Sequence, residues 1–199
     1  MTGRYPWPPL RGDQLRTTQM LRLLARRHRV TLLCPDPSER DRRESAVPEN
    51  VEVLHYRRGR SDLGTGTLGA LLGSRPLQTA PYHAADLQRR LKEAAPQHDL
   101  VVLQLARIAE AREVIGDVPF VADLIDSLAL NFTTRAECDR QWLRPFWRLE
   151  ARRLARLEEE LVRESVQSWV VCDRDRRSVL ERTPSLSPES LQVVPLVVE

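Results

Sequence analysis

Long hydrophobic runs are absent from this sequence. No stretch of about 18 apolar residues, the least that a membrane-crossing helix needs, occurs among its 199 residues. The first residues, Met1-Thr2-Gly3-Arg4-Tyr5, also lack the continuous apolar segment of a signal peptide. We therefore expect neither a spanning helix nor secretion, and we expect a cytoplasmic protein.

Cysteine is scarce and scattered. Cys34, Cys138 and Cys172 lie far apart and form no Cys-x-x-Cys pair, which argues against a disulfide framework and against a structural zinc site. The four histidines are equally dispersed and lack the spacing of metal ligands. The sequence predicts reduced thiols, no metal site and no resident cofactor.

Lysine is almost missing, because Lys92 is the single one among 31 basic residues. Arginine binds phosphate and carboxylate groups in a bidentate manner, so a phosphate-bearing ligand or an anionic membrane surface fits this composition. The 28 acidic residues leave a net charge of only +3. Because no zinc finger, heptad zipper or basic-aromatic RNA motif is present, we expect no nucleic-acid partner.

Short apolar runs alternate with helical patterns along the chain. The predicted strands are Val30–Cys34, Val51–Tyr56, Leu100–Leu103, Phe120–Ile125, Trp169–Cys172 and Leu191–Val194. The predicted helices are Gln14–Arg27, Leu63–Leu72, Ala84–Ala95, Ala106–Ile115, Leu128–Glu164 and Arg174–Glu181, with loops at Pro35–Asn50, Gly59–Thr67 and Thr183–Ser190. This order predicts an α/β fold, a Rossmann-like parallel sheet with helices on both faces.

The segment before the first predicted helix has two unusual features. Only Met1–Tyr5 precedes the loop that leads into this helix. Because such a fold normally has a hydrophobic strand at that point, we expect a shortened first strand. The proline-stiffened loop Pro6–Arg11 then leads to Gly12 and a helix N-terminus, which favours an anion through free N–H groups and the helix dipole. A plain loop in which Gly12 or Asp13 caps the helix is the alternative.

These residues also carry a family resemblance. The loop contains Pro8, Pro9, Gly12, Asp13 and Arg16, and the helix and strand that follow contain Leu23, Leu24, His28 and Val30. Further matching segments are Asp123–Ser127, Arg148–Leu154, Trp169–Cys172 and Val193–Pro195. Together they resemble the N-terminal half of family 4 glycosyltransferases of the GT-B fold, especially bacterial sugar transferases of exopolysaccharide clusters, over most of the chain.

The resemblance implies an enzyme that moves a sugar from a nucleotide-sugar donor to a hydroxyl of a glycan or lipid-linked acceptor without a metal. Such enzymes have two Rossmann-like domains. Residues 1–195 would form the acceptor-side domain, and residues 196–199 would begin the linker to a donor-binding domain that this sequence does not contain. On this interpretation the chain alone is inactive.

Site residues follow from the resemblance position by position. Gly12, Asp13 and Arg16 would line the cleft, with the Gly12 backbone near the donor diphosphate and Arg16 as an anion contact. Many relatives have a histidine after the strand that corresponds to Leu100–Leu103, which is the fourth when the shortened first strand is counted. This chain has Gln104 there as a substitute candidate. Asp123 and Asp126 lie at the carboxyl end of the next strand, Phe120–Ile125, at the sheet edge that binds ligands. Asp126 is equally suited to cap the next helix.

The long predicted helix Leu128–Glu164 carries two further candidates. Glu150 falls on its apolar face, so we expect a buried carboxylate that has a structural ion pair or else a role in the cleft. On another face, arginines recur every four residues, at Arg140, Arg144, Arg148, Arg152 and Arg156. They form either a solvated row paired with acids such as Glu159 or a contact with anionic lipid, which would place the protein at the periphery of the inner membrane.

Two other functions stay open at this point. One is a non-catalytic Rossmann-like module that holds a phosphorylated small molecule at the Gly12 turn. The other is an NAD-dependent oxidoreductase using the G-x-G-x-x-G pattern of Gly64, Gly66 and Gly69. That pattern does not directly follow a predicted strand, as a dinucleotide fingerprint requires.

Overall fold

The computed structural model describes residues 1–59, 64, 70, 73 and 75–196. Its strands are β1 (Val30–Pro35), β2 (Val51–Tyr56), β3 (Val101–Gln104), β4 (Phe120–Ile125), β5 (Gln167–Val170) and β6 (Leu191–Val193). Its α-helices are α1 (Gly12–Leu24), α2 (Glu39–Arg43), α4 (Ala85–Ala94), α5 (Leu128–Cys138), α6 (Arg144–Glu164) and α7 (Asp173–Arg182). Short 3₁₀ helices are η1 (Leu77–Tyr82), η2 (Ala95–Gln97), η3 (Ala106–Glu113), η4 (Gln141–Leu143) and η5 (Pro188–Ser190).

All strand pairs are parallel, in a two-stranded sheet β1-β2 and a four-stranded sheet β3-β4-β5-β6. Met1 and Thr2 lie between the sheets. The Thr2 N–H donates to Leu33 O at 3.0 Å, and Gln104 N–H donates to Met1 O at 3.2 Å. The order across the molecule is therefore β2-β1-(Met1–Thr2)-β3-β4-β5-β6. The fold is α/β and Rossmann-like, as the sequence predicts.

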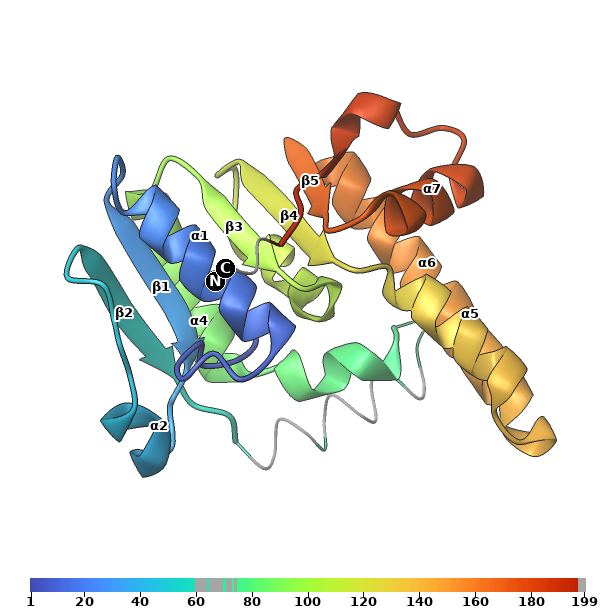
Figure 1. Ribbon diagram of the computed structural model, residues 1–199, viewed down its shortest axis with the longest axis horizontal. Coiled ribbons are helices and arrows are strands. Elements are labelled where there is room, and N and C mark those ends of the chain that lie inside the picture. The colour runs from blue at the N-terminus through green and yellow to red at the C-terminus, as the bar shows by residue number, and fades with distance from the viewer. Residues whose placement is uncertain (60–63, 65–69, 71–72, 74, 197–199) are drawn as a thin grey trace.

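Helices cover both faces of these sheets, with α1 on one side and α4 on the other (Figure 1). Because side chains of a strand alternate between faces, Leu32 and Cys34 pack with Trp7 and Leu21 under α1. Leu33 instead joins the larger core on the α4 side. Burial raises the pKa of the Cys34 thiol to about 12, so this free cysteine is an inert core residue.

The predicted single helix Leu128–Glu164 is wrong, because two helices form a hairpin there (Figure 1). α5 ends at Cys138 with Asp139 in an extended conformation, and Pro145 lies in the first turn of α6, where its missing N–H costs nothing. The Trp147 indole N–H donates to Asp139 at 2.8 Å, and its ring contacts Phe132 edge to face. These contacts join the two helices near the turn.

Other predicted boundaries move by a few residues. The predicted strand Trp169–Cys172 starts earlier and ends at Val170, because Cys172 is already the N-cap of α7. The predicted loop Pro35–Asn50 contains α2, whose N-cap Ser38 and Asp41 form a reciprocal capping box. Most of the predicted helix Leu63–Leu72 lies outside the described residues.

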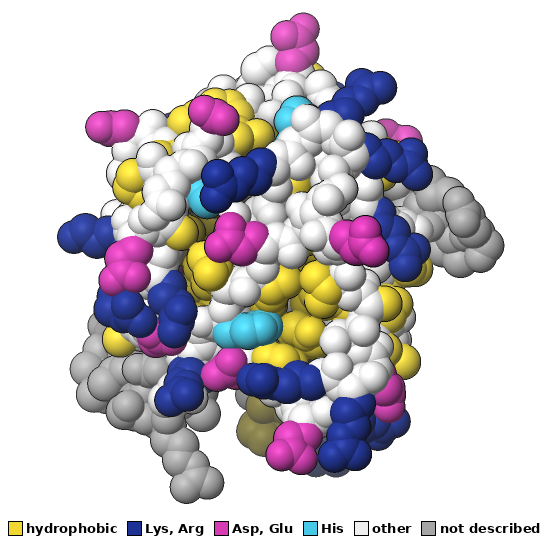
Figure 2. Space-filling model, turned by 90° about the vertical axis from the view of Figure 1, so that its left-hand side faces the viewer, with side chains coloured by type: hydrophobic (Ala, Val, Ile, Leu, Met, Phe, Trp, Pro, Cys, Tyr) yellow, Lys and Arg dark blue, Asp and Glu magenta, His cyan; other side chains and the backbone are white. Residues whose placement is uncertain are grey.

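β2 is an edge strand, and the face beside it carries interspersed charges of both signs (Figure 2). Glu52 on β2 is exposed and lies 3.9 Å from Arg29. Charged side chains on an edge strand discourage pairing with another sheet. The charges beside β2 therefore disfavour the addition of another strand at its edge.

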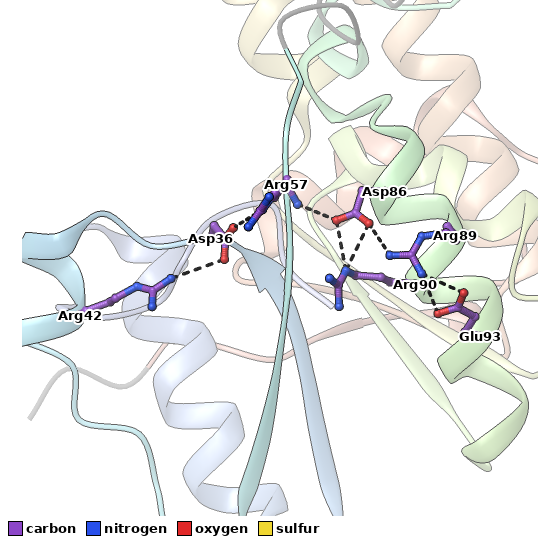
Figure 3. A network of polar contacts seen from close by, with 7 residues as sticks. All are labelled: Asp36, Arg42, Arg57, Asp86, Arg89, Arg90 and Glu93. Atoms are coloured by element: carbon purple, nitrogen blue, oxygen red, sulfur yellow. Dashed lines mark hydrogen bonds and ion pairs between the residues drawn. The ribbon is translucent and has the colours of Figure 1, made fainter.

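A polar network ties the ends of β1 and β2 to α4 (Figure 3). Asp36, which follows β1, pairs with Arg57 at 3.4 Å. The Arg57 N–H donates to Asp86 at 2.9 Å, and Asp86 pairs with Arg89 and Arg90 on the same helix. The bond from Arg57, with those from Arg89 and Arg90, lowers the pKa of Asp86 from 3.8 to about 2.

Asp86 is expected to make stability fall at acidic pH. Because its pKa is lower in the folded chain, the ionised carboxylate stabilises the fold above pH 3.8, and this contribution disappears as the pH falls towards 2. The Asp86→Asn variant should melt below the wild type at pH 6 and together with it at pH 2. Thermal melts between pH 2 and 6 measure this. Glu93→Gln, which removes an exposed pair, is the control, and equal slopes for wild type and Asp86→Asn would contradict the assignment.

Candidate functional site

The candidate site lies where the direction of strand progression reverses. From Met1–Thr2 the chain continues to β1 on one side, and β3 lies on the other side. In open α/β sheets, ligands bind beyond the carboxyl ends of the strands at such a switch point. Here that position is occupied by the loop of residues 3–11 and by the first turn of α1.

Polar contacts hold this loop against α1. Arg4 pairs with Asp13 at 3.2 Å, and the Gln14 side-chain amide donates to Tyr5 O at 2.8 Å. The Arg58 guanidinium donates to Gly3 O from the other side. The N-cap of α1 is Arg11, which makes no capping hydrogen bond with its side chain. The alternative in which Gly12 or Asp13 caps the helix is therefore wrong.

Gly12 is the first residue of α1, and the space above it is open. A Cβ atom at this position would have no heavy atom within 4 Å. The first N–H groups of a helix have no partner within the helix, and the helix dipole gives them partial positive charge. A small anion can therefore approach the first turn of α1 along Gly12 without displacing a side chain.

Arg16 and Asp123 meet each other below this turn. The Arg16 guanidinium donates to the Asp123 carboxylate at 2.7, 2.8 and 3.0 Å and to Val194 O at 2.7 Å. Both side chains are buried, at 3% and 0% exposure. Thr17 in the next position of α1 donates to the Gln104 side chain. The structure thus brings Arg16, Gln104 and Asp123 together. Their polar groups bind other groups of the chain and do not point toward an open ligand site.

Backbone strain marks the ends of the two central strands. Leu105 follows β3 with φ +77°, and Ile125 ends β4 with φ +66°, both in the left-handed region that side chains disfavour. The Leu105 N–H donates to Asp123 O at 2.8 Å, and Val171 N–H donates to Ile125 O at 2.8 Å. Strain of this kind costs about 1–3 kcal/mol per residue and is concentrated at functional sites. It supports a ligand site at this edge.

Asp126 follows the strained Ile125. Burial raises the pKa of Asp126, and the nearby Asp175 adds to that shift. Its carboxylate accepts a hydrogen bond of 2.6 Å from the Asn131 side chain. The N-cap of α5 is Ser127, whose hydroxyl accepts from Leu130 N at 3.2 Å. The interpretation of Asp126 as the helix cap is therefore wrong, and its place at the carboxyl edge of β4 stands.

Glu150 is buried, with 1% exposure, as its position on the apolar face of the helix predicts. It accepts a hydrogen bond from Leu77 N at 2.8 Å and pairs with Arg153 at 3.4 Å. The structural ion pair is thus confirmed. These contacts connect α6 to η1.

Two groups of polar contacts were not predicted from the sequence. Glu158 is fully buried and accepts from Ala129 N, Ser127 Oγ and Arg182 at 2.8 to 3.0 Å. Its position between Leu157 and Leu161 on the apolar face of α6 was the available signal. His83 lies 2.6 Å from Glu110. No sequence signal connects these two residues.

The arginines of the row, of which Arg140 precedes α6 and the other four lie on it, have no carboxylate partner among the described residues. Glu159, expected as a partner of the row, pairs instead with Arg163 at 2.6 Å, so that pairing is wrong. Arg148 and Arg152 line a groove of about 240 Å³ between α5 and α6, together with Arg182. Within the described ranges, neither Arg148 nor Arg152 has an acidic partner. They remain available to an external anion.

Metal ligands, the dinucleotide pattern and membrane-spanning helices were three further features to locate among the described residues. No group of three or more potential metal ligands occurs among the described residues. Gly66 and Gly69 of the dinucleotide pattern lie outside those residues, and Gly64 is exposed. In the same part of the chain, no helix combines the length and apolarity needed to cross a bilayer.

No family model and no curated protein matches the sequence.

Proposed function

We propose that the chain is the acceptor-side domain of a GT-B glycosyltransferase, which transfers a sugar from a nucleotide-sugar donor to a hydroxyl of a glycan or lipid-linked acceptor. The observation that carries this proposal is the open first turn of α1 at the switch point of a Rossmann-like sheet. The sequence resemblance of the surrounding loop supports the same activity.

In this reaction the glycosidic C–O bond to the acceptor forms while the bond to the nucleoside diphosphate breaks. The acceptor hydroxyl proton leaves with the departing phosphate oxygen or to a carboxylate. The N–H groups of Gly12 and Asp13 would stabilise the negative charge on the diphosphate. Asp126, beside the strained end of β4, would orient the acceptor hydroxyl. The Arg16–Asp123 pair would position α1 without touching substrate.

A matched pair of glycine variants tests the proposal. Gly12→Val should weaken the binding of UDP at least about tenfold, because the side chain fills the space over the first turn. Gly64→Val should leave UDP binding unchanged. Both positions have no heavy atom within 4 Å of an added Cβ, so both variants should fold. Shifts of the Gly12 and Asp13 amide signals in ¹H–¹⁵N spectra during titration with UDP measure the affinity.

The same titrations separate the alternatives. Saturable NAD binding that Gly64→Val abolishes would overturn the proposal in favour of an oxidoreductase. Binding of inorganic phosphate at the first turn of α1 without any response to UDP would favour a non-catalytic module. Unchanged UDP binding in Gly12→Val would remove Gly12 from the site.

We also propose that the tip of the α5–α6 hairpin contacts an anionic lipid surface, where a lipid-linked acceptor is found. Trp142 and Leu149 are exposed at 71% and 46%, and Phe146 lies between them along the helix. Arg148 and Arg152, which have no acidic partner among the described residues, lie on the neighbouring face of α6, where they line the groove toward α5. An aromatic residue beside arginines suits the interface of an anionic bilayer.

Vesicle binding checks the lipid proposal. Arg148→Glu combined with Arg152→Glu should lower affinity for phosphatidylglycerol vesicles about tenfold or more, since each basic side chain near such a surface contributes about 1 kcal/mol. Trp142→Ser should also weaken binding. Leu23→Ser, on a distant exposed side chain, is the control. Equal sedimentation of all variants with vesicles would contradict a lipid contact at the hairpin.

A further inference from the structure

A groove of about 240 Å³ lies between α5 and α6, the two helices of the hairpin that extends away from the sheet (Figure 1). From α6 it is lined by Arg148, Ala151, Arg152 and Ala155, at positions i, i+3, i+4 and i+7 of one helical face. Such a face normally packs apolar side chains against a neighbouring element. Here the alanines are too small to fill the space toward α5, and the arginines border it.

Three arginine side chains meet at this groove. Arg148 and Arg152 come from successive turns of α6 and have no acidic partner among the described residues, and Arg182 comes from α7. Glu158 holds the Arg182 guanidinium at 2.8 Å, but 31% of that side chain stays exposed. One carboxylate, that of Glu137, also borders the groove, so the described lining carries an excess of positive charge. Arginine binds phosphate in a bidentate manner, and a phosphate between these groups would relieve their repulsion.

The inner end of the groove is connected to the candidate site. Arg182 donates to Ser127 Oγ at 3.1 Å, and Ser127 directly follows Asp126. Thr133, which lines the groove, lies further along α5, about 9 Å from Ser127 at about 1.5 Å per residue. The groove therefore begins about two helical turns from the carboxylate that would orient the acceptor hydroxyl.

The outer end of the groove leads to the tip of the hairpin. The exposed side chains of Trp142 and Leu149 lie toward this tip, and Arg148 directly precedes Leu149 in α6. From the tip inward, the order is therefore apolar side chains, arginines and the carboxylate of Asp126. A sugar that is linked through phosphate to an apolar chain has the same order of groups: the chain, the phosphate and the hydroxyl-bearing sugar.

We propose that the groove between α5 and α6 is a phosphate site, in which Arg148, Arg152 and Arg182 hold the phosphate or diphosphate group of an amphiphilic acceptor. The apolar chain of that acceptor extends toward Trp142, and its sugar extends toward Asp126. The acceptor role rests on the proposed transferase function, whereas the phosphate site does not. The arginines select the acceptor and take no part in the bonds that form and break.

Geranyl diphosphate, a soluble amphiphile, is the probe. The amide signals of Thr133 and Ala151 in ¹H–¹⁵N spectra of the whole chain should shift saturably with it. Inorganic pyrophosphate, which lacks the apolar chain, should bind at least about tenfold more weakly, and geraniol, which lacks the phosphates, should not saturate. Absence of shifts at these amides would overturn the proposal. Equal affinity for pyrophosphate would identify a site for free phosphate instead, and equal affinity for geraniol would show that the arginines do not bind the phosphates.

Two matched pairs of variants locate the site. Arg152→Gln should weaken the binding of geranyl diphosphate about tenfold, whereas Arg156→Gln, on the next arginine of the row and outside the lining, should leave it unchanged. Thr133→Phe should block the groove, and Thr134→Phe is its control. Both threonines are exposed on α5, and each hydroxyl donates to the carbonyl four residues earlier. Unchanged affinity in either Arg152→Gln or Thr133→Phe would contradict a phosphate site in the groove.

The same spectra test the groove and the first turn of α1 separately. If Gly12 and Asp13 respond to UDP while the groove does not respond to geranyl diphosphate, the transferase proposal stands and the phosphate site is wrong. The opposite pattern would overturn the transferase proposal and the acceptor role of the bound ester, and the phosphate site on the hairpin would stand.

Discussion

The Arg16→Leu variant is expected to lose about 3–5 kcal/mol of its free energy of unfolding. Arg16 is buried, and its guanidinium donates to Asp123 on β4 and to Val194 O after β6. Removing it leaves the Asp123 carboxylate charged, without exposure to water and without its partner. Urea denaturation followed by circular dichroism measures the loss.

A double-mutant cycle separates the pair from its surroundings. Asp123→Leu should cost a similar amount, whereas Arg16→Leu combined with Asp123→Leu should recover much of the loss, because no unpaired charge is then buried. Arg163→Leu, which removes the exposed pair with Glu159, should cost less than about 1 kcal/mol. If Arg16→Leu lowered the free energy of unfolding as little as Arg163→Leu does, the buried pair would not be what holds α1 on the sheet.

The Glu158→Leu variant is expected to lose about 3 kcal/mol or more. The carboxylate accepts hydrogen bonds from Ala129 N and Ser127 Oγ at the start of α5 and pairs with Arg182 on α7. Leucine would leave the first two groups buried without an acceptor. Thermal and urea denaturation at pH 7 measure the effect.

The Glu158→Gln variant should lose less stability than Glu158→Leu. Burial raises the pKa of Glu158, so part of the folding free energy is spent on keeping this carboxylate charged. Glu158→Gln is neutral and still offers an acceptor to Ala129 N. Glu160→Leu, on an exposed side chain that pairs with Arg112, is the matched control. If the glutamine and leucine variants lost equal stability, the hydrogen bonds to α5 would not be the source.

The strands were predictable because their side chains follow short, local patterns. Val51–Tyr56 and Phe120–Ile125 have the predicted bounds, since runs of β-branched and aromatic residues between turns have few other stable arrangements. The helix break after Cys138 was not predictable from periodicity. The amphipathic pattern continues across it, and the local signal for a new helix start is Pro145, which lies in the first turn of α6. The contacts of Trp147 with Asp139 and Phe132 then hold the two helices together.

In the candidate site, too, local features could be predicted from the sequence and long-range pairs could not. The loop and the open turn at Gly12 follow from residues close together in the chain. The pairing of Arg16 with Asp123 joins residues 107 positions apart, and Glu158 meets Arg182 across two helices. Such pairs are set by how the elements pack, so the sequence names the charged residues without naming their partners.

The connection through Met1 and Thr2 also makes the two sheets one unit for unfolding. β1 and β2 have a small core of their own, which contains Trp7, but Leu33 and Tyr56 belong to the larger core, and the buried Arg16–Asp123 pair joins α1 to β4. A part of the chain that shares such contacts with its neighbour opens alone only at a large cost in free energy. Trp7 and Trp169 should therefore report the same unfolding transition, and different midpoints for the two residues would show that the sheets open separately.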